Sequence, residues 1–236
     1  MITVLRHRID SRRQHDTRPG TVNGRDGGGV RHGGGLGLAA VGRGPAPTTG
    51  PAAAVDAMAE HGYHGTSVRD IGERADMSPA ALYHHFPSKQ KLLFTIMDRG
   101  IDELIRRSEE AYAAALNDPA DKLRALVRVH VLRHIERQKE SFLGNSELRS
   151  LEEPGRSTIL AKRDHQMHLF YLAIRDGIER GRFQTPFPTE AARGVITMCT
   201  AVATWYNKAG PLSPEEIASR YAELALAMVG HVPQEG

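Results

Sequence analysis

Two pairs of histidines are spaced so that each pair could share one face of a helix. His130 and His134 are four residues apart, and His165 and His168 are three apart. Residues at these spacings lie on the same side of an α-helix, and imidazoles from facing helices can ligate zinc. A metal site made of the four histidines is one hypothesis. The alternative, which we prefer, is that they are packed or solvated like most helical histidines, so we predict no metal and no other cofactor.

The motifs of common enzymes are absent. The sequence contains no G-x-S-x-G nucleophile turn, no H-E-x-x-H metalloprotease motif and no phosphate-binding P-loop. The glycines near the N-terminus follow no predicted strand and precede no predicted helix, as a dinucleotide site would require. We therefore expect no catalytic activity.

Aromatic and soft apolar residues of the C-terminal half could line a pocket for an organic molecule, and nearby arginines could receive an anion. Each of these residues, taken singly, could also be ordinary core or surface. The predicted effector-binding residues are Phe142, Arg149, Arg163, Tyr171, Met198 and Trp205.

A different chemistry is predicted between residues 62 and 94, where two short helices flank a tight turn. The first helix carries Val68, Ile71 and Ala75 on one face, and Ser78 with the proline after it gives the second helix a start signal. If Leu82 packs inward, the rest of the second helix is exposed and can enter the DNA major groove. The predicted DNA-binding residues are Thr66, Ser67, Ser78, Ala80, Tyr83, His84 and Lys89.

The elements that must position these groups are all predicted to be helices. No alternating apolar run is long enough for a strand, and proline, glycine and capping residues fall between the periodic segments. The fold class is therefore all-α, with about nine helices. The expected ranges are 51–61, 66–75, 79–85, 88–116, 118–139, a short helix around 146–151, 155–180, 189–208 and 213–229.

The N-terminal segment differs in composition from the rest. Residues 1–50 hold eight arginines, three aspartates and 12 of the 24 glycines, a net charge of +5, whereas residues 51–236 carry 23 basic and 25 acidic groups. We predict that residues 1–50 are disordered, because they lack periodic apolar residues. They are either a basic arm that attracts phosphate or, as we prefer, sequence translated from a start set too far upstream or in a shifted frame.

Cysteine content and hydropathy set further limits. The single cysteine, Cys199, allows no disulfide framework within the chain. No run approaches 18 apolar residues, and the first residues show no apolar signal segment. We expect a cytoplasmic protein with no membrane partner, associated with the nucleoid when it is bound to DNA.

The stretch from residue 62 to residue 94 matches the pattern G-[YF]-x-x-T-[ST]-V-x-x-I followed by S-x-x-x-[LI]-Y-x-H-F-x-[SN]-K-x-x-L. In this respect it resembles the DNA-binding domain of the TetR family of bacterial repressors. Gly72 stands where the family usually has alanine and should weaken its helix by about 1 kcal/mol. Asp76 replaces the usual turn glycine and tolerates a left-handed conformation. The matching positions are Gly62, Tyr63, Thr66, Ser67, Val68, Ile71, Ser78, Leu82, Tyr83, His85, Phe86, Ser88, Lys89 and Leu92.

The segments SELRSL, RDHQ, RDGIERGRF and WYNKAGPLSPEEIA are similar to C-terminal domains of family members that respond to acyl-CoA thioesters. The resemblance implies that the last two helices pair with their copies in a homodimer. Small residues that would let these helices approach closely are Ala191, Ala192, Gly194, Thr197, Ala201, Ala222, Ala225 and Ala227.

The predicted organisation is a tail (1–50), a helix-turn-helix domain (51–97), an effector-binding and dimerisation domain (98–230) and a disordered C-terminus (231–236). The predicted function is a ligand-responsive transcriptional regulator, a dimeric repressor released from palindromic operator DNA by a small organic effector such as an acyl-CoA thioester. Two alternatives stay open: a metal-responsive repressor that uses His130, His134, His165 and His168, or a helical domain that does not bind DNA.

Overall fold

The computed structural model describes residues 49–233, all within the larger of the two compact units into which the chain divides. These residues form nine α-helices and one turn of 3₁₀-helix, and they include no strand. The bounds are α1 Thr49–Gly65, α2 Val68–Ala75, α3 Pro79–His85, α4 Lys89–Ala114, α5 Pro119–Glu136, α6 Gln138–Ser146, η1 Leu148–Ser150, α7 Gly155–Glu179, α8 Pro188–Trp205 and α9 Pro214–Met228.

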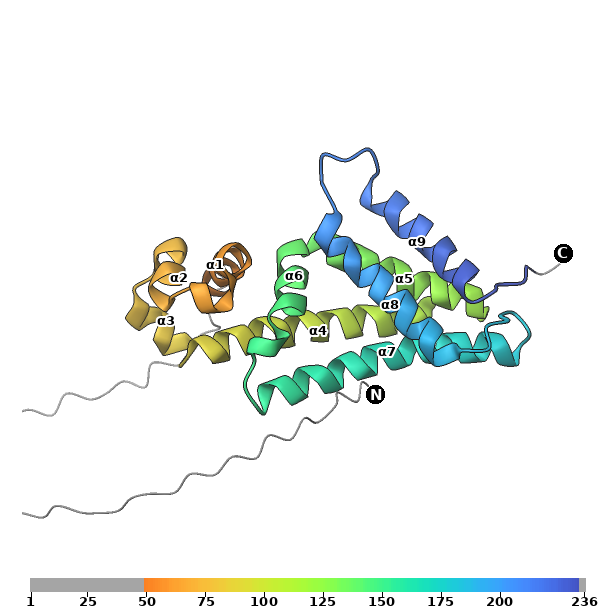
Figure 1. Cartoon of the computed structure of the whole chain (residues 1–236), viewed down its shortest axis with the longest axis horizontal. Coiled ribbons are helices and arrows are strands. Elements are labelled where there is room, and N and C mark those ends of the chain that lie inside the picture. Colours follow the sequence, from red (N-terminus) through yellow and green to blue (C-terminus); the bar gives the residue numbers. More distant parts are fainter. Residues whose placement is uncertain (1–48, 234–236) are drawn as a thin grey trace, which may run out of the picture. The chain divides into compact units, whose positions relative to one another are not determined.

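The first three helices gather around the start of α4 (Figure 1). Met58 of α1, Ile71 of α2 and Leu82 of α3 are almost completely buried, and they share a core with Leu92 and Leu93 of α4. Helices as short as α2 and α3 are not stable alone in water. Their packing on α1 and α4 therefore holds the helix-turn-helix together.

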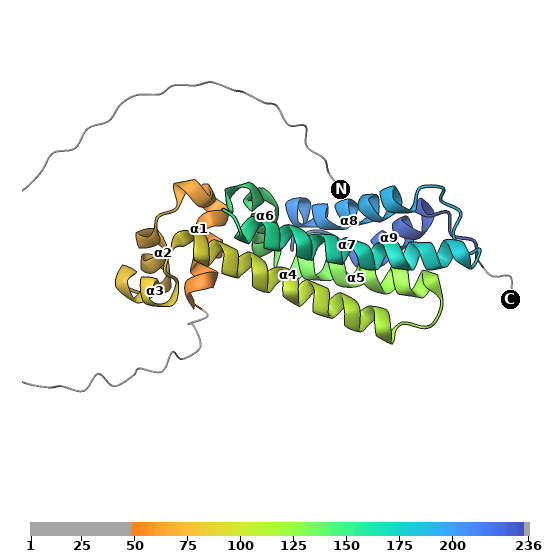
Figure 2. The ribbon, with the colours of Figure 1, turned by 90° about the horizontal axis from the view of Figure 1, so that it is seen from below.

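The C-terminal bundle is built around α5, which packs on α4, α7, α8 and α9. Figure 2 shows α4, α5 and α7 running alongside one another. Buried residues such as Leu123, Val127, Phe170, Val195 and Ala222 form its core. Because α4 contributes Leu92 to the N-terminal core and Leu104 to the buried part of the bundle, one continuous helix joins both regions.

The all-α prediction is confirmed for the described residues, and most predicted helix ends lie within a few residues of the observed ones. The short helix predicted around residues 146–151 was placed too late, because α6 occupies Gln138–Ser146 and only η1 follows. No side chain caps the start of α6 and Leu143 is its single fully buried residue, so the sequence carries little signal for it.

The predicted tails need adjusted limits. The first helix begins at Thr49, inside the segment predicted as a tail. At the other end, His231 donates its N–H to the Leu226 carbonyl and Val232 donates to that of Arg182, so the predicted disorder does not begin at residue 231. Residues 1–48 and 234–236, for which disorder was predicted, lie outside the described residues.

Gly72 is tightly packed where the family usually has alanine. A Cβ atom built on it would lie 2.7 Å from the carbonyl oxygen of Met77, whose N–H bonds to the Gly72 carbonyl. Alanine gains about 1 kcal/mol in helix propensity, but crowding a packed site costs about 1–3 kcal/mol. We expect Gly72→Ala to lower the melting temperature, by about 2–4 °C for each kcal/mol lost.

The matched control is Gly65→Ala, because a Cβ there meets only the His61 side chain, at 3.6 Å. Both variants are compared with the wild type by thermal unfolding followed by circular dichroism. A Gly72→Ala protein that melts at or above the wild-type temperature would show that the Met77 carbonyl moves away from the added Cβ at little cost.

Among the described helices, none is long and apolar enough to cross a membrane.

Candidate DNA-binding surface and ligand cavity

Side-chain caps fix the turn between α2 and α3. Ser67 and Asp70 form a reciprocal capping box at the start of α2, with N–H to oxygen distances of 2.8 and 3.1 Å. The hydrogen bond that the backbone N–H of Ser67 donates to the Asp70 carboxyl lowers the pKa of that carboxyl. Asp76 takes the predicted left-handed conformation, with φ of 52°, and the Ser78 hydroxyl accepts the Ala81 N–H at 3.1 Å. The two serines predicted at the DNA surface therefore also hold the helix starts, where helix N–H groups remain free for an anion.

The outer face of α3 is accessible along its length. Leu82 is buried, whereas Ala80, Tyr83 and His84 are exposed, Tyr83 to 48%. No Arg, Lys, Asn or Gln lies on α3. Direct base contacts from this helix would therefore be made by apolar side chains, the Tyr83 phenol and the imidazoles of His84 and His85.

Two predicted phosphate contacts are used inside the protein. Thr66 is 1% exposed, and its hydroxyl bonds to the carbonyls of Gly62, at 2.8 Å, and Ala57, at 3.1 Å. Lys89 donates to the carbonyls of Tyr63 and Thr66, at 2.9 and 2.8 Å, and lies over the Tyr63 ring. The Thr66 prediction is wrong for its side chain, and Lys89 serves first to bind the end of α1. Lys91 is exposed on the first turn of α4 and was not among the predicted DNA-binding residues.

A cavity of about 480 Å³ lies among α4, α5, α6, α7 and α8. One part of its wall is apolar, with side chains that include Ile96, Met97, Ile101 and Leu104 of α4. The rest is largely polar and includes His130, His134, Asn145, Arg163, Gln166 and Thr200. This volume lies within the range of about 300–1,000 Å³ typical of small-molecule sites.

Of the six predicted effector-binding residues, only Arg163 lines this cavity. Ser141, Gly144 and Asn145 face it from α6, so Phe142, one residue after Ser141, points elsewhere and is 41% exposed. Arg149 is exposed in η1, and Met198 packs against the bundle core. Tyr171 lines a separate, smaller pocket of about 210 Å³ with His168.

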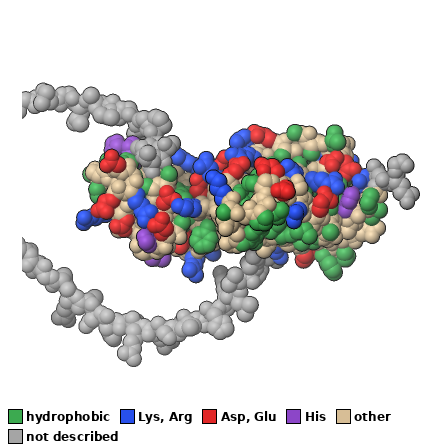
Figure 3. Space-filling view, turned by 90° about the horizontal axis from the view of Figure 1, so that it is seen from above, with side chains coloured by type: hydrophobic (Ala, Val, Ile, Leu, Met, Phe, Trp, Pro, Cys, Tyr) green, Lys and Arg blue, Asp and Glu red, His purple; other side chains and the backbone are tan. Residues whose placement is uncertain are grey.

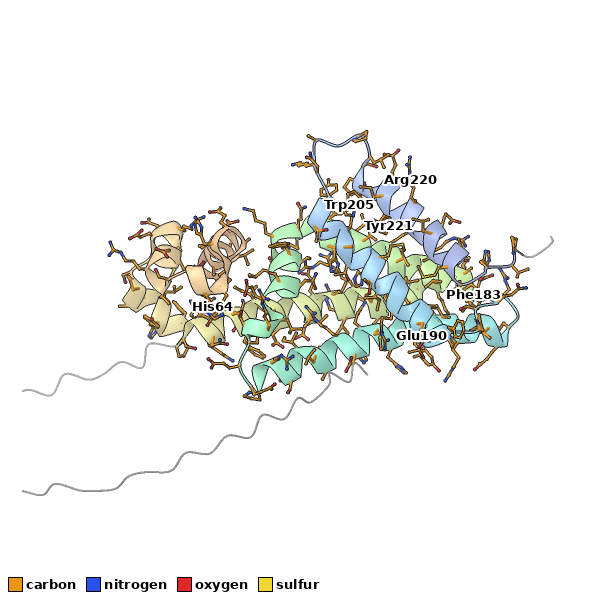
Figure 4. All side chains as sticks on the ribbon, in the orientation of Figure 1. His64, Phe183, Glu190, Trp205, Arg220 and Tyr221 are labelled. Carbon is orange, nitrogen blue, oxygen red and sulfur yellow. The ribbon has the colours of Figure 1, made fainter. Side chains whose placement is uncertain are left out.

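Trp205, the last of the six, is also outside the cavity. It lies at the end of α8 beside Tyr221 of α9, with ring centroids 6.2 Å apart (Figure 4). Trp205 is 50% exposed, and Leu224 and Met228 of α9 are also exposed. Figure 3, which views the side of the bundle that carries these two helices, shows hydrophobic side chains gathered there. Of the small residues predicted between partner helices, Ala191, Ala192, Ala222 and Ala225 are instead buried in the core of the chain.

Two arginines at the cavity differ in their charge balance. Arg133 is paired with Glu103 and Glu140, each at 3.0 Å, and is nearly buried. Arg163 donates to the Gly144 carbonyl at 2.8 Å and to the Asn145 side-chain oxygen at 3.3 Å, and the described residues provide no carboxylate within ion-pair distance. Burial lowers the pKa of Arg163. Its charge is therefore the one available to an anion.

His130 and His134 of α5 stack against each other, with ring centroids 4.3 Å apart. Nδ1 of His134 is 2.7 Å from the His130 carbonyl, so Nδ1 carries the proton, and Nε2 of His130 is 2.9 Å from the Thr200 hydroxyl. Burial lowers the pKa of both imidazoles, that of His134 to about 4. Both rings are neutral at pH 7. Their spacing led to the metal-site hypothesis, but neither histidine was among the predicted effector-binding residues.

The four histidines do not form a metal site. His165 is exposed and bonds to Glu109 at 2.9 Å, and His168 stacks on Tyr171 beside the smaller pocket. Within residues 49–233, no group of three or more His, Cys, Asp or Glu side chains is placed to hold a metal ion. The hypothesis that joins His130 and His134 to His165 and His168 is therefore wrong.

The neutral state of His134 predicts a pH dependence of stability. Its folded pKa of about 4 lies below the ordinary value of 6.5, so the unfolded chain binds a proton more readily between these pH values. Stability contributed by this group is complete above pH 6.5 and is lost as the pH falls toward 4, by about 3 kcal/mol in all. We expect His134→Gln to unfold with a flatter dependence over this interval in urea titrations. Equal slopes for variant and wild type would contradict the assignment.

One helix of the cavity wall also contacts the DNA-binding part. Glu140, Ser141, Gly144 and Asn145 of α6 line the cavity, whereas Leu143 is buried in the N-terminal core. Lys139 of α6 pairs with Asp56 of α1 at 2.5 Å. Ile96 and Met97 of α4 belong both to that core and to the cavity wall. Ile159 of α7 is shared in the same way. A change in cavity shape can therefore act on α1–α3 directly, through α4 and α6 in particular.

Known proteins match the same two regions. Residues 52–96 match the sequence profile of bacterial regulatory proteins of the tetR family, and residues 116–229 match that of the tetracyclin repressor-like C-terminal domain. The HTH-type transcriptional repressor KstR2 of Mycobacterium tuberculosis is 26% identical over 182 residues, which cover 76% of this chain and 88% of KstR2.

Solved structures share the fold. A bacterial regulatory protein in the tetR family from Rhodococcus RHA1 superimposes with a TM-score of 0.73 and 30% identity, over 78% of this chain and 97% of that protein. AibR, solved in complex with isovaleryl coenzyme A and operator DNA, gives a TM-score of 0.68 at 24% identity, over 78% of this chain and all of AibR.

Proposed function

This chain belongs to the TetR family of bacterial regulatory proteins, and from that premise we propose that it is a dimeric transcriptional repressor whose ligand cavity controls its hold on operator DNA. The observation that carries the proposal is that α4 and α6 belong both to the cavity wall and to the N-terminal core. Both helices line the cavity and contribute buried side chains to the core that supports α2 and α3.

The proposed DNA contact is made by α3 in the major groove. Ala80, Tyr83 and His84 face the bases or the groove wall, and the helix starts capped by Ser67 and Ser78 face phosphates. Lys91, exposed near the start of α4, supplies the cation that was expected from Lys89. A helix-turn-helix dimer presents two such surfaces about 34–36 Å apart.

The proposed dimer interface is the exposed apolar face of α8 and α9. Trp205, Leu224 and Met228 are large apolar side chains that remain exposed in the single chain, and a neighbouring copy would remove them from water. The pairing brings two DNA-binding domains under the control of two cavities.

The proposed effector is an acyl thioester of coenzyme A. Apolar side chains of α4 suit an acyl group, and the unpaired charge of Arg163 suits a phosphate or carboxylate. The acyl group would enter the cavity while the larger, anionic part of the molecule stays toward Arg163 and solvent. One protein of the same fold supports this effector class: AibR was solved with isovaleryl coenzyme A and operator DNA.

The proposed switch is a change in the spacing of the two recognition helices. An effector that fits better when α4 and α6 are displaced shifts the dimer toward that state, and DNA affinity falls by the ratio of its affinities for the two states. The effector and the DNA need no direct contact.

The first test is DNA binding by the purified full chain. We expect a fluorescently labelled fragment from upstream of the gene to bind at nanomolar protein concentrations, with a two-fold symmetric footprint and an affinity that falls with salt. Equal affinity for a scrambled fragment of the same composition would contradict operator recognition and favour a helical domain that does not read DNA.

A further inference from the structure

Two polar side chains on the cavity wall have hydrogen-bonding atoms with no partner among the described residues. His130 is 3% exposed and Gln166 is 2% exposed, and both line the cavity. Nδ1 of His130 and Oε1 of Gln166 are the unpaired atoms. A buried polar atom without a partner is costly, so a protein that keeps two of them beside one cavity has a use for them.

The Gln166 amide and the His130 ring each keep one unpaired atom, whichever way the amide is turned and whichever ring nitrogen carries the proton. Gln166 bonds to the buried hydroxyl of Ser108 at 2.9 Å, and a hydroxyl can pair with either end of the amide, so one end is always left over. Likewise the Thr200 hydroxyl can accept from Nε2 of His130 or donate to it, and in both cases Nδ1 remains free. Two side chains that line the cavity are therefore each left with one unpaired polar atom, an amide end of Gln166 and Nδ1 of His130.

These groups lie at the more buried part of the cavity wall. Asn145, beside Arg163, is exposed, whereas His130 and Gln166 are almost completely shielded from water. Arg163 and Gln166 lie on the same helix, α7, one turn apart, His130 lies on α5, and the apolar side chains of α4 line the same cavity. A plain hydrocarbon end would leave both polar atoms unpaired.

We propose that the effector's acyl group carries an oxygen function, a hydroxyl or a ketone, that bonds to His130 and Gln166. A hydroxyl both donates and accepts, so it can pair with either form of each group, and a ketone can accept from both when they act as donors. This inference rests on the proposed function and specifies the effector within it. Sites built to bond a hydroxyl reject analogues that lack it, because their own polar groups are then left unpaired.

The test compares coenzyme A thioesters of equal carbon number on the full chain by isothermal titration calorimetry. One set is plain, and the other carries a single hydroxyl or ketone at successive positions beyond C3. We expect at least one oxygenated thioester to bind about tenfold or more tightly than its plain counterpart. In Gln166→Met and in His130→Phe this preference should shrink to about twofold, with plain thioesters bound at least as well as by the wild type.

The matched control is His165→Phe, which changes an exposed histidine of α7 that does not line the cavity and should leave the preference intact. Thermal unfolding checks that each variant folds. Gln166→Met removes a single hydrogen bond, to Ser108, so it serves if His130→Phe is unstable.

Each outcome decides between defined alternatives. Equal affinity for plain and oxygenated thioesters, or a preference that survives in both cavity variants, overturns the inference and means that water pairs with these atoms. Binding with the expected preference but without release of DNA supports the inference and contradicts the proposed switch. If no thioester of either kind binds, the effector class is wrong and the inference with it.

Discussion

Ala80→Glu should abolish operator binding while leaving the fold unchanged. Ala80 is exposed on α3 and makes no contribution to the buried core, so a larger polar side chain costs the folded state little. In the major groove the new carboxylate would lie among phosphates, twice per dimer. Because juxtaposed like charges cost several kcal/mol, we expect the affinity for the operator to fall by about 100-fold or more.

The matched control is Ala113→Glu, which adds the same charge at an exposed alanine near the end of α4. Fluorescence anisotropy with labelled operator gives the affinities, and circular dichroism checks the helix content of both variants. Operator binding within about threefold of the wild type in Ala80→Glu would mean that α3 does not enter the groove.

Arg163→Met should weaken effector binding and leave the affinity for operator DNA unchanged. Methionine keeps an apolar side chain in the wall and removes the charge of Arg163, whose hydrogen-bond partners within residues 49–233 are the Gly144 carbonyl and the Asn145 side chain. A hydrogen bond to a charged group contributes about 1.5–3 kcal/mol, so the thioester concentration that releases half of the DNA should rise about 10- to 150-fold.

Arg175→Met is the control for this change. Arg175 lies on the same helix, is exposed and pairs with Glu179 at 3.3 Å, away from the cavity. We expect wild-type release in this variant. If Arg163→Met releases DNA at the wild-type concentration, the anion is bound elsewhere, and Arg149, the other predicted arginine, becomes the next candidate.

The fold and the DNA-binding helices could be predicted because their signals are local. Caps such as Ser67 and Ser78, and the apolar spacing of Val68, Ile71 and Ala75, act within a few residues of the sequence. Asp76 was correctly expected to tolerate the left-handed turn. Helix α6 was misplaced because its few buried contacts come from other helices.

The cavity was harder to predict because five helices contribute to it. A sequence shows which residues share one helix face, but whether that face meets a void or a neighbour depends on how the helices pack. Phe142 and Trp205 look like ligand contacts by type, yet both are exposed away from the cavity. The spacing of His130 and His134 showed that they share one helix face, and the structure adds that this face is buried and borders an open volume.

Thr66 and Lys89 illustrate a third limit. Both match the pattern of the family, and both side chains are used within the domain to bind the end of α1. A motif match shows that a residue belongs to the domain, but not whether it faces inward or outward.

The central claim is that cavity occupancy and DNA binding are linked through α4 and α6, and reciprocity tests it most directly. The measurement is the affinity of the thioester for the free protein and for the protein saturated with operator, together with operator affinity with and without the thioester. Linkage requires the operator to weaken thioester binding by the same factor by which the thioester weakens operator binding, typically about 5- to 150-fold. Equal thioester affinity for the free and the DNA-bound protein would contradict the account.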